Sequence, residues 1–348
     1  MPNAAVPCFL SVVIPTHNRR DLVARAVQSV LDQDRMQRVQ VVVVDDGSTD
    51  GTAELLGQRY GDDARFELLS SPRRHASAAR NLGFQAARGS HVCFLDSDDY
   101  WLEGTLANIE HAFATYPTLA FVSVEGATLA TPTQAALERI VAGDSPGWSH
   151  AKFHSAPLQS ASIELAVGSG CARLLHGDFF PAIINGDLFY LSGLVMRREC
   201  VASAGGFNER FRYFNDWEFF ARMCAQSHGA YLEYDGFRRD TGQPDQISRR
   251  RPPTSIARRR LFIVRSLLRR APFAAAYGNE LRAALIDACY QMGRALPTGP
   301  HRAWAARYLR RCILHGHKVL RSVVLLGGLA PRSSRGSHSA AGSAAMER

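Results

Sequence analysis

The chain has 348 residues, enough for two domains or for one large domain with an appendage. Its composition, 46% apolar and 21% charged, excludes a wholly disordered chain, a collagen-like repeat and a small disulfide-stabilised protein. The net charge of +9 is unevenly distributed. Residues 249–348 hold 20 basic and 3 acidic residues, a charge of +17, whereas residues 1–248 carry −8. An acidic body with a basic C-terminal part is expected to have two separate roles.

The termini and the cysteines bear on the compartment of the protein. The first residues have neither the basic segment nor the apolar run of a signal peptide. The best apolar run near the C-terminus, Val319–Ala330, is shorter than the roughly 20 residues that span a bilayer. The seven cysteines contain no Cys-x-x-Cys pair, which favours reduced thiols over a zinc site or a disulfide framework. These features predict a cytoplasmic protein without a membrane-spanning helix.

Apolar runs alternate with amphipathic segments along the first third of the chain. Strands that alternate with helices at this spacing predict βαβ units and a mostly parallel sheet. Ligands of such sheets bind beyond the carboxyl ends of the strands. Asn18 is predicted to cap the first helix. The predicted strands are Leu10–Ile14, Val39–Val44, Arg65–Leu69, His91–Leu95 and Leu119–Val124, and the predicted helices are Leu22–Leu31, Thr52–Tyr60, Ala76–Ala87 and Trp101–Thr115.

The pattern changes twice in the rest of the chain. Thr128–Leu175 has little periodicity and is interpreted as an insertion or an acceptor-side region. Asp216–Ser227 is amphipathic, which predicts a helix, and Tyr231–Tyr234 is a predicted strand. Arginine-rich helices are expected beyond residue 249, followed by a Ser/Ala/Gly-rich tail that is expected to be disordered. These segments are Thr254–Arg270, Phe273–Ala295, Arg302–His315 and the tail Ser333–Arg348.

A group of polar residues follows the predicted strand His91–Leu95, namely Asp96, Ser97, Asp98 and Asp99. Residues i and i+2 of an extended segment face the same way, so Asp96 and Asp98 aim two carboxylates at one place. Such hard oxygen ligands suit Mg²⁺ or Mn²⁺, which usually keep water and share ligands with the phosphates of a substrate. The alternative is a solvated acidic turn that caps the next helix.

Two other acidic motifs stand at the ends of predicted elements. Asp45 and Asp46 follow a valine-rich strand, where a carboxylate can accept hydrogen bonds from a base or a ribose. There is no Gly-x-Gly-x-x-Gly sequence, so this is not the dinucleotide-binding fingerprint. Asp216 begins a helix shortly after a Gly-Gly-Phe segment and could serve as a general base. The alternative for both motifs is a structural turn or helix cap.

The motifs occur in a definite order: Val12–Arg19 (VVIPTHNR), Val44–Thr52 (VDDGSTDGT), Ala79–Gly83 (ARNLG), Phe94–Asp99 (FLDSDD), Gly205–Phe207 (GGF) and Asn215–Glu218 (NDWE). Together they resemble family 2 glycosyltransferases, over about residues 9–245. The resemblance implies the GT-A fold, an α/β fold with a Rossmann-like, mostly parallel central sheet flanked by helices. It also implies inverting transfer of a sugar from a nucleotide-diphosphate donor.

The resemblance assigns roles to individual residues. Asp46 is expected to contact the base, Asp96 and Asp98 the divalent metal and the donor, and Asp216 to act as the catalytic carboxylate. Arg80 and Asn81 are expected to contact the phosphate or the sugar of the donor. The residues expected to bind the nucleotide sugar are Pro15, His17, Asp45, Asp46, Arg80, Asn81, Asp96, Ser97, Asp98 and Asp99.

Two positions depart from the family pattern. The usual acidic pair before the aromatic residue is here Asn215-Asp216, so only the second acid is present. A histidine often follows the next strand, near the metal, but the corresponding stretch here is Arg238–Gly242. Asp240 is the residue that could substitute for it as a third metal ligand.

The expected organisation is a GT-A catalytic domain at residues 9–248, a basic helical extension at 249–330 and a tail at 331–348. Within the catalytic domain, the nucleotide-binding half covers about residues 9–125 and the acceptor half about 126–248. The expected enzyme is metal-dependent and transfers a sugar, with UDP-sugar the default donor, to a glycan or lipid-linked acceptor, as in cell-surface polysaccharide synthesis.

The basic extension has three interpretations. Arginine clusters among apolar positions are typical of a surface that meets anionic lipid, which would place the enzyme at the inner face of the cell membrane. The second is a helical appendage packed on the catalytic domain. Binding of nucleic acid is disfavoured, because no recognition motif is present and the body is acidic. A catalytically degenerate glycosyltransferase-like binding protein is a further alternative, against which Asp96, Asp98 and Asp216 argue.

Overall fold

The computed structural model describes residues 8–34, 36–128, 156–186, 188–211, 214–240, 255–295, 302–316, 318, 321–323 and 325–326. The chain divides into two compact units. The first contains residues 1–252 and 262–284, and the second contains residues 253–261 and 285–348. Helices α10 (Ser255–Leu268) and α11 (Ala271–Ala295) contribute to both units. The boundary predicted at residue 248 stays a prediction.

A single sheet organises the first unit. Its strands are β1 (Leu10–Thr16), β2 (Val39–Asp45), β3 (Phe66–Ser70), β4 (His91–Phe94), β5 (Asp99–Trp101), β6 (Phe121–Thr128), β7 (Leu158–Glu164), β8 (Cys171–Gly177), β9 (Leu194–Arg197) and β10 (Gly229–Arg239). Their order is β3-β2-β1-β4-β9-β6-β10-β8-β7, and β5 pairs with β10.

The predicted α/β fold with a mostly parallel central sheet is confirmed. Strands β3, β2, β1 and β4 run parallel, and so do β6 and β10. Strand β9 lies antiparallel between the two groups. The carboxyl ends of β1, β2, β4, β6 and β10 therefore meet at one edge of the sheet.

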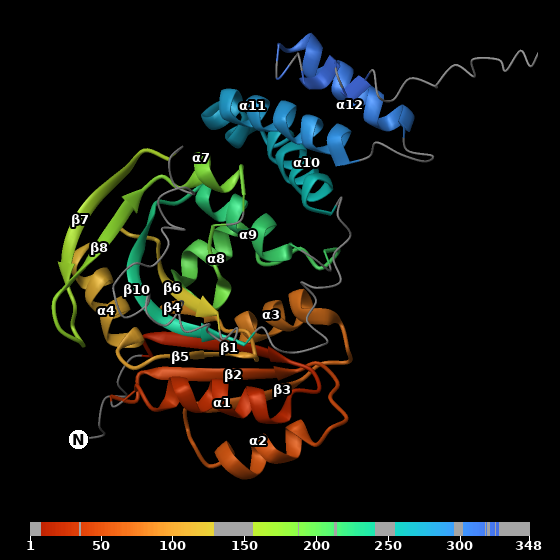
Figure 1. Cartoon of the computed structure of the whole chain (residues 1–348). Coiled ribbons are helices and arrows are strands. Elements are labelled where there is room, and N and C mark those ends of the chain that lie inside the picture. The colour runs from red at the N-terminus through yellow and green to blue at the C-terminus, as the bar shows by residue number, and fades with distance from the viewer. Residues whose placement is uncertain are drawn as a thin grey trace, which may run out of the picture. The chain divides into compact units, whose positions relative to one another are not determined.

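Helices cover both faces of this sheet (Figure 1). They are α1 (Arg20–Leu31), α2 (Thr52–Tyr60), α3 (His75–Ala86), α4 (Thr105–Thr115), α7 (Phe180–Ile183), α8 (Arg198–Ala204) and α9 (Asn215–Cys224), with a 3₁₀ turn at Leu191–Gly193. In Figure 1, α1 and α2 lie on one face of β1 and β2, and α3 lies on the other. Helix α3 approaches β1 closely at Gly83, where a Cβ would come within 2.3 Å of Val13.

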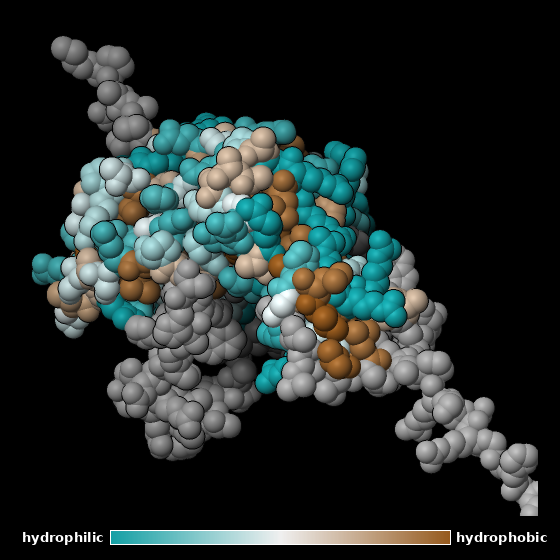
Figure 2. Space-filling view, turned by 90° about the horizontal axis from the view of Figure 1, so that it is seen from above, coloured by the Kyte–Doolittle hydropathy of each residue, from teal (hydrophilic) through white to brown (hydrophobic). Residues whose placement is uncertain are grey.

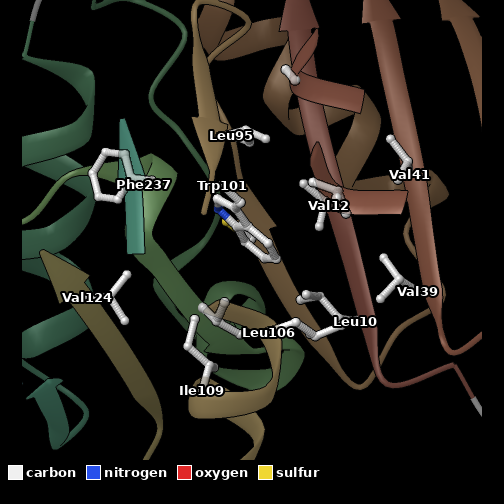
Figure 3. Packing of buried hydrophobic residues seen from close by; sticks show 14 of the residues in the cluster. Leu10, Val12, Val39, Val41, Leu95, Trp101, Leu106, Ile109, Val124 and Phe237 are labelled. Carbon is white, nitrogen blue, oxygen red and sulfur yellow. The ribbon is translucent and has the colours of Figure 1, made fainter. Parts of the chain in front are cut away.

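A buried apolar cluster holds α1 and α4 against one face of the sheet. The valines of β1 and β2 are buried on both faces, which is why these strands read as continuous apolar runs rather than as alternating ones. Trp101 is 3% exposed and lies at the centre of the cluster, with Leu106 and Leu10 beside it (Figure 3). Burial of so many large side chains is the main source of stability for this unit.

The structure corrects two predictions about local structure. Trp101 does not begin a helix but ends strand β5, and α4 starts at Thr105 after Gly104, whose φ is +85°. The Trp101 indole donates to the backbone carbonyl of Ser192 at 2.7 Å, which fixes the residue in the core. Asn18 does not cap α1. Its φ is +50°, and its side-chain oxygen accepts from the backbone N–H of Thr49 at 2.8 Å.

The weakly patterned segment Thr128–Leu175 contains more structure than its sequence suggests. Strands β7 and β8 form an antiparallel hairpin that extends the sheet beyond β10. The signal is weak because β7 has exposed residues at most positions, so no regular alternation appears. Residues 129–155 of that segment, the stretch from residue 241 to 254 and the predicted disordered tail lie outside the described residues.

The second unit is helical, as predicted for the basic extension. Its described part comprises the first turns of α10, the second half of α11, helix α12 (Arg302–Leu314) and a few residues after it. Asp287 of α11 pairs with Arg260 of α10 at 2.5 Å and with Lys318 at 2.7 Å. Within the described residues, no helix is both long and apolar enough to cross a membrane.

Candidate functional site

The predicted site residues gather at the carboxyl edge of the sheet. Pro15 is buried in β1, and His17 follows the end of that strand. Asp45 ends β2, and Asp96 stands two residues beyond the end of β4. The parallel register of these strands explains why His17 and Asp96, 79 positions apart in the sequence, come to the same edge.

Three neighbouring carboxylates lie in the segment after β4. Asp98 and Asp99 are largely buried, whereas the side chain of Asp96 is 41% exposed. Burial and the charge of Asp96 raise the pKa of Asp98. Burial and the charges of Asp96 and Asp98 raise the pKa of Asp99 well above its usual range. The fold thus keeps negative charge concentrated in a poorly hydrated place, at a cost in stability.

Arginines contact two of these carboxylates. Arg80 of α3 donates to Asp96 at 2.6 Å, and Arg19 contacts Asp98 at 2.7 Å. The Nε and Nη1 atoms of Arg80 are buried and have no hydrogen-bond partner among the described residues. The guanidinium lies over the ring of Phe207 at 5.3 Å. This arrangement leaves fixed positive charge beside the acidic segment, and such charge can bind an anionic group of a ligand.

Arg25 of α1 contacts two segments of the same edge. Its Nη2 donates to the backbone carbonyl of Asp98 at 3.1 Å and lies 3.5 Å from the carboxylate of Asp240. Its guanidinium also lies over the Tyr100 ring at 4.5 Å. Asp240, the residue considered as a third metal ligand, is therefore paired with an arginine.

The carboxylate of Asp46 is occupied by the protein itself. Its oxygens accept hydrogen bonds from Ser71 Oγ at 2.9 Å, from the N–H of Arg74 at 2.7 Å and from the N–H of His75 at 2.8 Å. Asp46 thus stabilises the start of α3, the helix that carries Arg80. Asp45 accepts from the N–H of Ser48 at 3.0 Å. The Nδ1 atom of His17 is buried and has no hydrogen-bond partner among the described residues.

Helix α3 connects the acidic segment after β4 to the segments around Phe207 and Asn215. Ser77, Arg80 and Asn81 have the spacing i, i+3 and i+4, so they lie on one face of the helix. The Asn81 amide forms two hydrogen bonds with the backbone of Phe207, at 2.8 and 2.9 Å. Asn81 therefore holds the Gly-Gly-Phe segment, while Arg80 on the same face holds Asp96.

Asp216 lies in the first turn of α9, and its neighbour Asn215 anchors that turn. The Asn215 side chain donates to Ser77 Oγ at 2.6 Å and accepts from the N–H of Asp216 at 2.8 Å. Asn215 is 9% exposed, whereas Asp216 is only partly buried. The residue that departs from the family's acidic pair thus has a structural use here, because an amide can both donate and accept.

The first C-terminal helix reaches the same segment. The ring of Phe262 in α10 packs edge-to-face on Phe211 at 5.0 Å. The carbonyl of Phe211 accepts from Ser77 Oγ at 3.3 Å, and Ser77 in turn accepts from Asn215. In α11, Tyr277 packs on Phe180 at 4.1 Å. Parts of the basic extension therefore belong to the packing of the first unit.

The residues around Asp96 and Asp98 suit a divalent cation in chemistry. Both supply hard carboxylate oxygens two residues apart, and their mutual repulsion is relieved by a cation. Across the described residues, no group of three or more His, Cys, Asp or Glu side chains is arranged to hold a metal. The protein would therefore supply few ligands, and the remaining ones would come from donor phosphates and water.

Several residues of this site escaped the sequence interpretation. Ser192 donates to Asp99 at 2.5 Å and accepts from the N–H of Asp96 at 3.2 Å. In the sequence, the signal for Ser192 is a polar residue within an apolar run. Arg19 is the last residue of the first motif, but the resemblance assigns it no role. Ser77 can be found from its spacing of three residues to Arg80 on the same helix.

Residues 11–183 match the family described as Glycosyl transferase family 2. The putative teichuronic acid biosynthesis glycosyltransferase TuaG of Bacillus subtilis is 40% identical over 99 residues, which cover 28% of this chain and 39% of that protein. The UDP-Glc:alpha-D-GlcNAc-diphosphoundecaprenol beta-1,3-glucosyltransferase WfaP of Escherichia coli is 30% identical over 107 residues, 31% of this chain and 42% of that protein. The aligned segments thus span less than half of these relatives.

A solved structure extends the likeness over most of the chain. The crystal structure of S. aureus TarS 1–349 in complex with UDP-GlcNAc has a TM-score of 0.57 and 16% identity, covering 91% of this chain and 89% of that one. At this identity the likeness concerns the fold. With its sheet, its acidic motifs in order and these relatives, the chain belongs to glycosyltransferase family 2 and has the GT-A fold.

Proposed function

We propose that the protein is an inverting, metal-dependent glycosyltransferase that uses a nucleotide-diphosphate sugar, by default a UDP-sugar. The observation that carries the proposal is the arrangement on α3. One face of this helix contacts the acidic segment through Arg80 and the segments around Phe207 and Asn215 through Asn81 and Ser77. A donor-binding group and a candidate base are thereby tied to the same rigid element, as a transfer reaction requires.

The nucleoside part of the donor is assigned to the ends of β1 and β2. Pro15 and His17 would line its pocket, and Asp45 and Asp46 would border it. Asp46 already accepts three hydrogen bonds from the protein. We therefore expect it to support binding of the nucleobase partly by holding the backbone between β2 and α3 in place. In support of a nucleotide-sugar donor, the S. aureus structure of the same fold is a complex with UDP-GlcNAc.

The diphosphate is assigned to the segment Asp96–Asp99 and its arginines. Asp96 and Asp98 would hold Mg²⁺ or Mn²⁺, with Ser97 and Asp99 beside them. When bound, such an ion neutralises the charge that develops on the leaving diphosphate. Arg19 and Arg80 lie within hydrogen-bonding distance of these carboxylates and would add fixed positive charge at the same place.

Asp216 is assigned the role of general base. Its carboxylate would take the proton from an acceptor hydroxyl while the oxygen forms a bond to the anomeric carbon of the sugar. The bond from that carbon to the diphosphate breaks in the same displacement, and its electron pair leaves with the nucleoside diphosphate. One in-line displacement inverts the configuration, and the sequence nominates no separate nucleophile for a double displacement.

The acceptor is proposed to be a glycan or a lipid-linked precursor of a cell-surface polysaccharide. The names of two relatives support this class, because one acts on a diphosphoundecaprenol-linked sugar by its name and the other is named for teichuronic acid biosynthesis. A lipid-linked acceptor would place the enzyme at the inner face of the cell membrane, as a peripheral protein.

The test is release of nucleoside diphosphate from a panel of nucleotide sugars, with Mn²⁺ or Mg²⁺ and without acceptor. Slow hydrolysis of one donor, abolished by EDTA, is the expected result for an active enzyme. Binding of a donor without hydrolysis or transfer would favour the degenerate binding protein instead. Hydrolysis at full rate in EDTA would contradict the metal dependence.

A further inference from the structure

The outward face of helix α12 is cationic. Arg307, Arg310 and Arg311 are exposed, and their spacing of three and four residues puts them on one face of the helix. Leu314, seven residues after Arg307, ends the same face and is 83% exposed. This face of the helix thus combines three exposed arginines with one exposed large apolar side chain.

The opposite face of α12 fixes this orientation. Ala305, Leu309 and Cys312 are fully buried. They face α11, where a Cβ on Gly293 would come within 2.6 Å of Leu309, so the two helices touch closely. Cys312 Sγ donates to the carbonyl of Ile286 at 3.4 Å. Because this face is packed, the arginines of the other face cannot turn inward.

The second unit has little negative charge with which to balance these arginines. Asp287 is the one carboxylate among its described residues, and it is engaged by Arg260 and Lys318. Burial acts to raise the pKa of Asp287, but the two cationic partners outweigh it and lower the pKa to about 2. The positive charge of the α12 face is therefore not neutralised within the described part of its own unit.

We propose that the α12 face of Arg307, Arg310, Arg311 and Leu314 docks onto an anionic lipid surface. Each arginine near such a surface gains electrostatic attraction, and an apolar side chain enters the boundary between headgroups and acyl chains. Phosphates of a nucleic acid would satisfy the arginines but offer no apolar environment for Leu314. In the view of Figure 2 the coloured residues are mostly hydrophilic, and the apolar ones form small patches.

This inference concerns the second unit alone and goes beyond the proposed transferase activity. Docking at a membrane does not require a functional donor site, so its test is independent of any sugar transfer. Lipid binding without transferase activity would leave the inference standing and refute only the proposed function.

The experiment is co-sedimentation of the full chain with vesicles of phosphatidylcholine, with and without phosphatidylglycerol. We expect binding to the anionic vesicles that weakens steeply between low and high salt. Replacing Arg307, Arg310 and Arg311 with Gln is expected to reduce the partition coefficient about a hundredfold. Leu314→Ser is expected to reduce it about tenfold at the same charge.

A matched control replaces three exposed arginines of the first unit, Arg59, Arg88 and Arg282, with Gln. It removes the same charge and is expected to change the partition coefficient less than threefold. Circular dichroism of each variant verifies that it is folded. Absence of binding to anionic vesicles at low salt, or equal losses in both triple variants, would overturn the inference. The inference would also be overturned if a DNA duplex displaced the wild-type protein from the vesicles and bound it more tightly than they do. In that case Leu314→Ser should bind the duplex as tightly as the wild type.

Discussion

Asp99 in the first unit and Asp287 in the second unit show two opposite uses of a buried carboxylate. Burial, Asp96 and Asp98 raise the pKa of Asp99 well above its usual range. For Asp287, contacts with Lys318 and Arg260 outweigh burial, and its pKa falls to about 2. The first arrangement destabilises the folded protein but favours the binding of a cation. The second contributes stability.

The carboxylates of the two units therefore differ in their charged surroundings. In the first unit, acidic groups lie at the edge of the sheet where a ligand is expected, and arginines face them without removing all repulsion. In the second unit, charge pairing joins α10, α11 and the residues after α12. Substitutions in the first group should therefore cost activity, and substitutions in the second should cost stability.

The largest effect is expected for Asp216→Asn. The amide cannot accept the acceptor proton, so transfer should fall by about a thousandfold or more. Binding of the donor should persist, because Asp216 is assigned no donor contact. Single-turnover transfer and donor titration measure the two quantities. The control is Asp62→Asn, an exposed carboxylate of the first unit; turnover of Asp216→Asn close to that of this control would remove Asp216 from the mechanism.

A loss of stability is expected for Asp287→Asn. The pKa of Asp287 is lowered from 3.8 to about 2, so its contribution is fully present above about pH 4 and is lost as the pH falls toward 2. The substitution should lower the free energy of unfolding by about 2 kcal/mol at pH 7, and by much less at pH 2.5. Urea denaturation at the two pH values measures this. An equal loss at both would show that the charge of Asp287 is not the cause.

Asn215→Ala tests the connection between α3 and α9. Removal of the side chain breaks the hydrogen bond to Ser77 and leaves the first turn of α9 free to move, so kcat should fall about tenfold while KM for the donor stays unchanged. Asn215→Asp retains an acceptor for the N–H of Asp216 and should recover part of kcat. If kcat stays at the wild-type value in Asn215→Ala, Asn215 has no positioning role.

These interactions also mark the limit of what the sequence predicted. The alternation of strands and helices gave the α/β fold, because buried parallel strands such as β2 carry five valines in six residues. Because these apolar runs show where the strands end, the acidic motifs that follow them could be placed at strand ends. The pairing of Arg19 with Asp98, and of Ser192 with Asp99, joins residues 79 and 93 positions apart, and no local pattern encodes it.

Local errors arose where tertiary contacts overrode local preference. Trp101 directly precedes a segment with a helical pattern. However, its indole is held in the core by Ser192, and β5 pairs with β10. Asn18 has the side chain of a helix cap, yet it bonds to Thr49 from a neighbouring loop. In both cases a partner distant in the sequence offers the polar group a better hydrogen bond than the local element does.

The smallest effect is expected for Asp99→Asn. Removing a charge that is buried next to two other carboxylates should raise the free energy of unfolding by about 1 kcal/mol at pH 7, in buffer with EDTA. The amide oxygen can still accept from Ser192. Denaturant titration measures the change, which should have the opposite sign to that of Asp287→Asn. A destabilisation as large as that of Asp287→Asn would mean that the two carboxylates do not differ in the way proposed.

The central claim is that the acidic segment after β4 binds a nucleotide-diphosphate sugar together with a divalent cation. A thermal-shift screen of nucleotide sugars tests it most directly, because a ligand that binds the folded state raises Tm. One donor should raise Tm of the wild type in Mn²⁺ or Mg²⁺ but not in EDTA, and Asp98→Ala should abolish the shift. A shift that survives in EDTA and in Asp98→Ala, or no shift with any donor, would contradict the account.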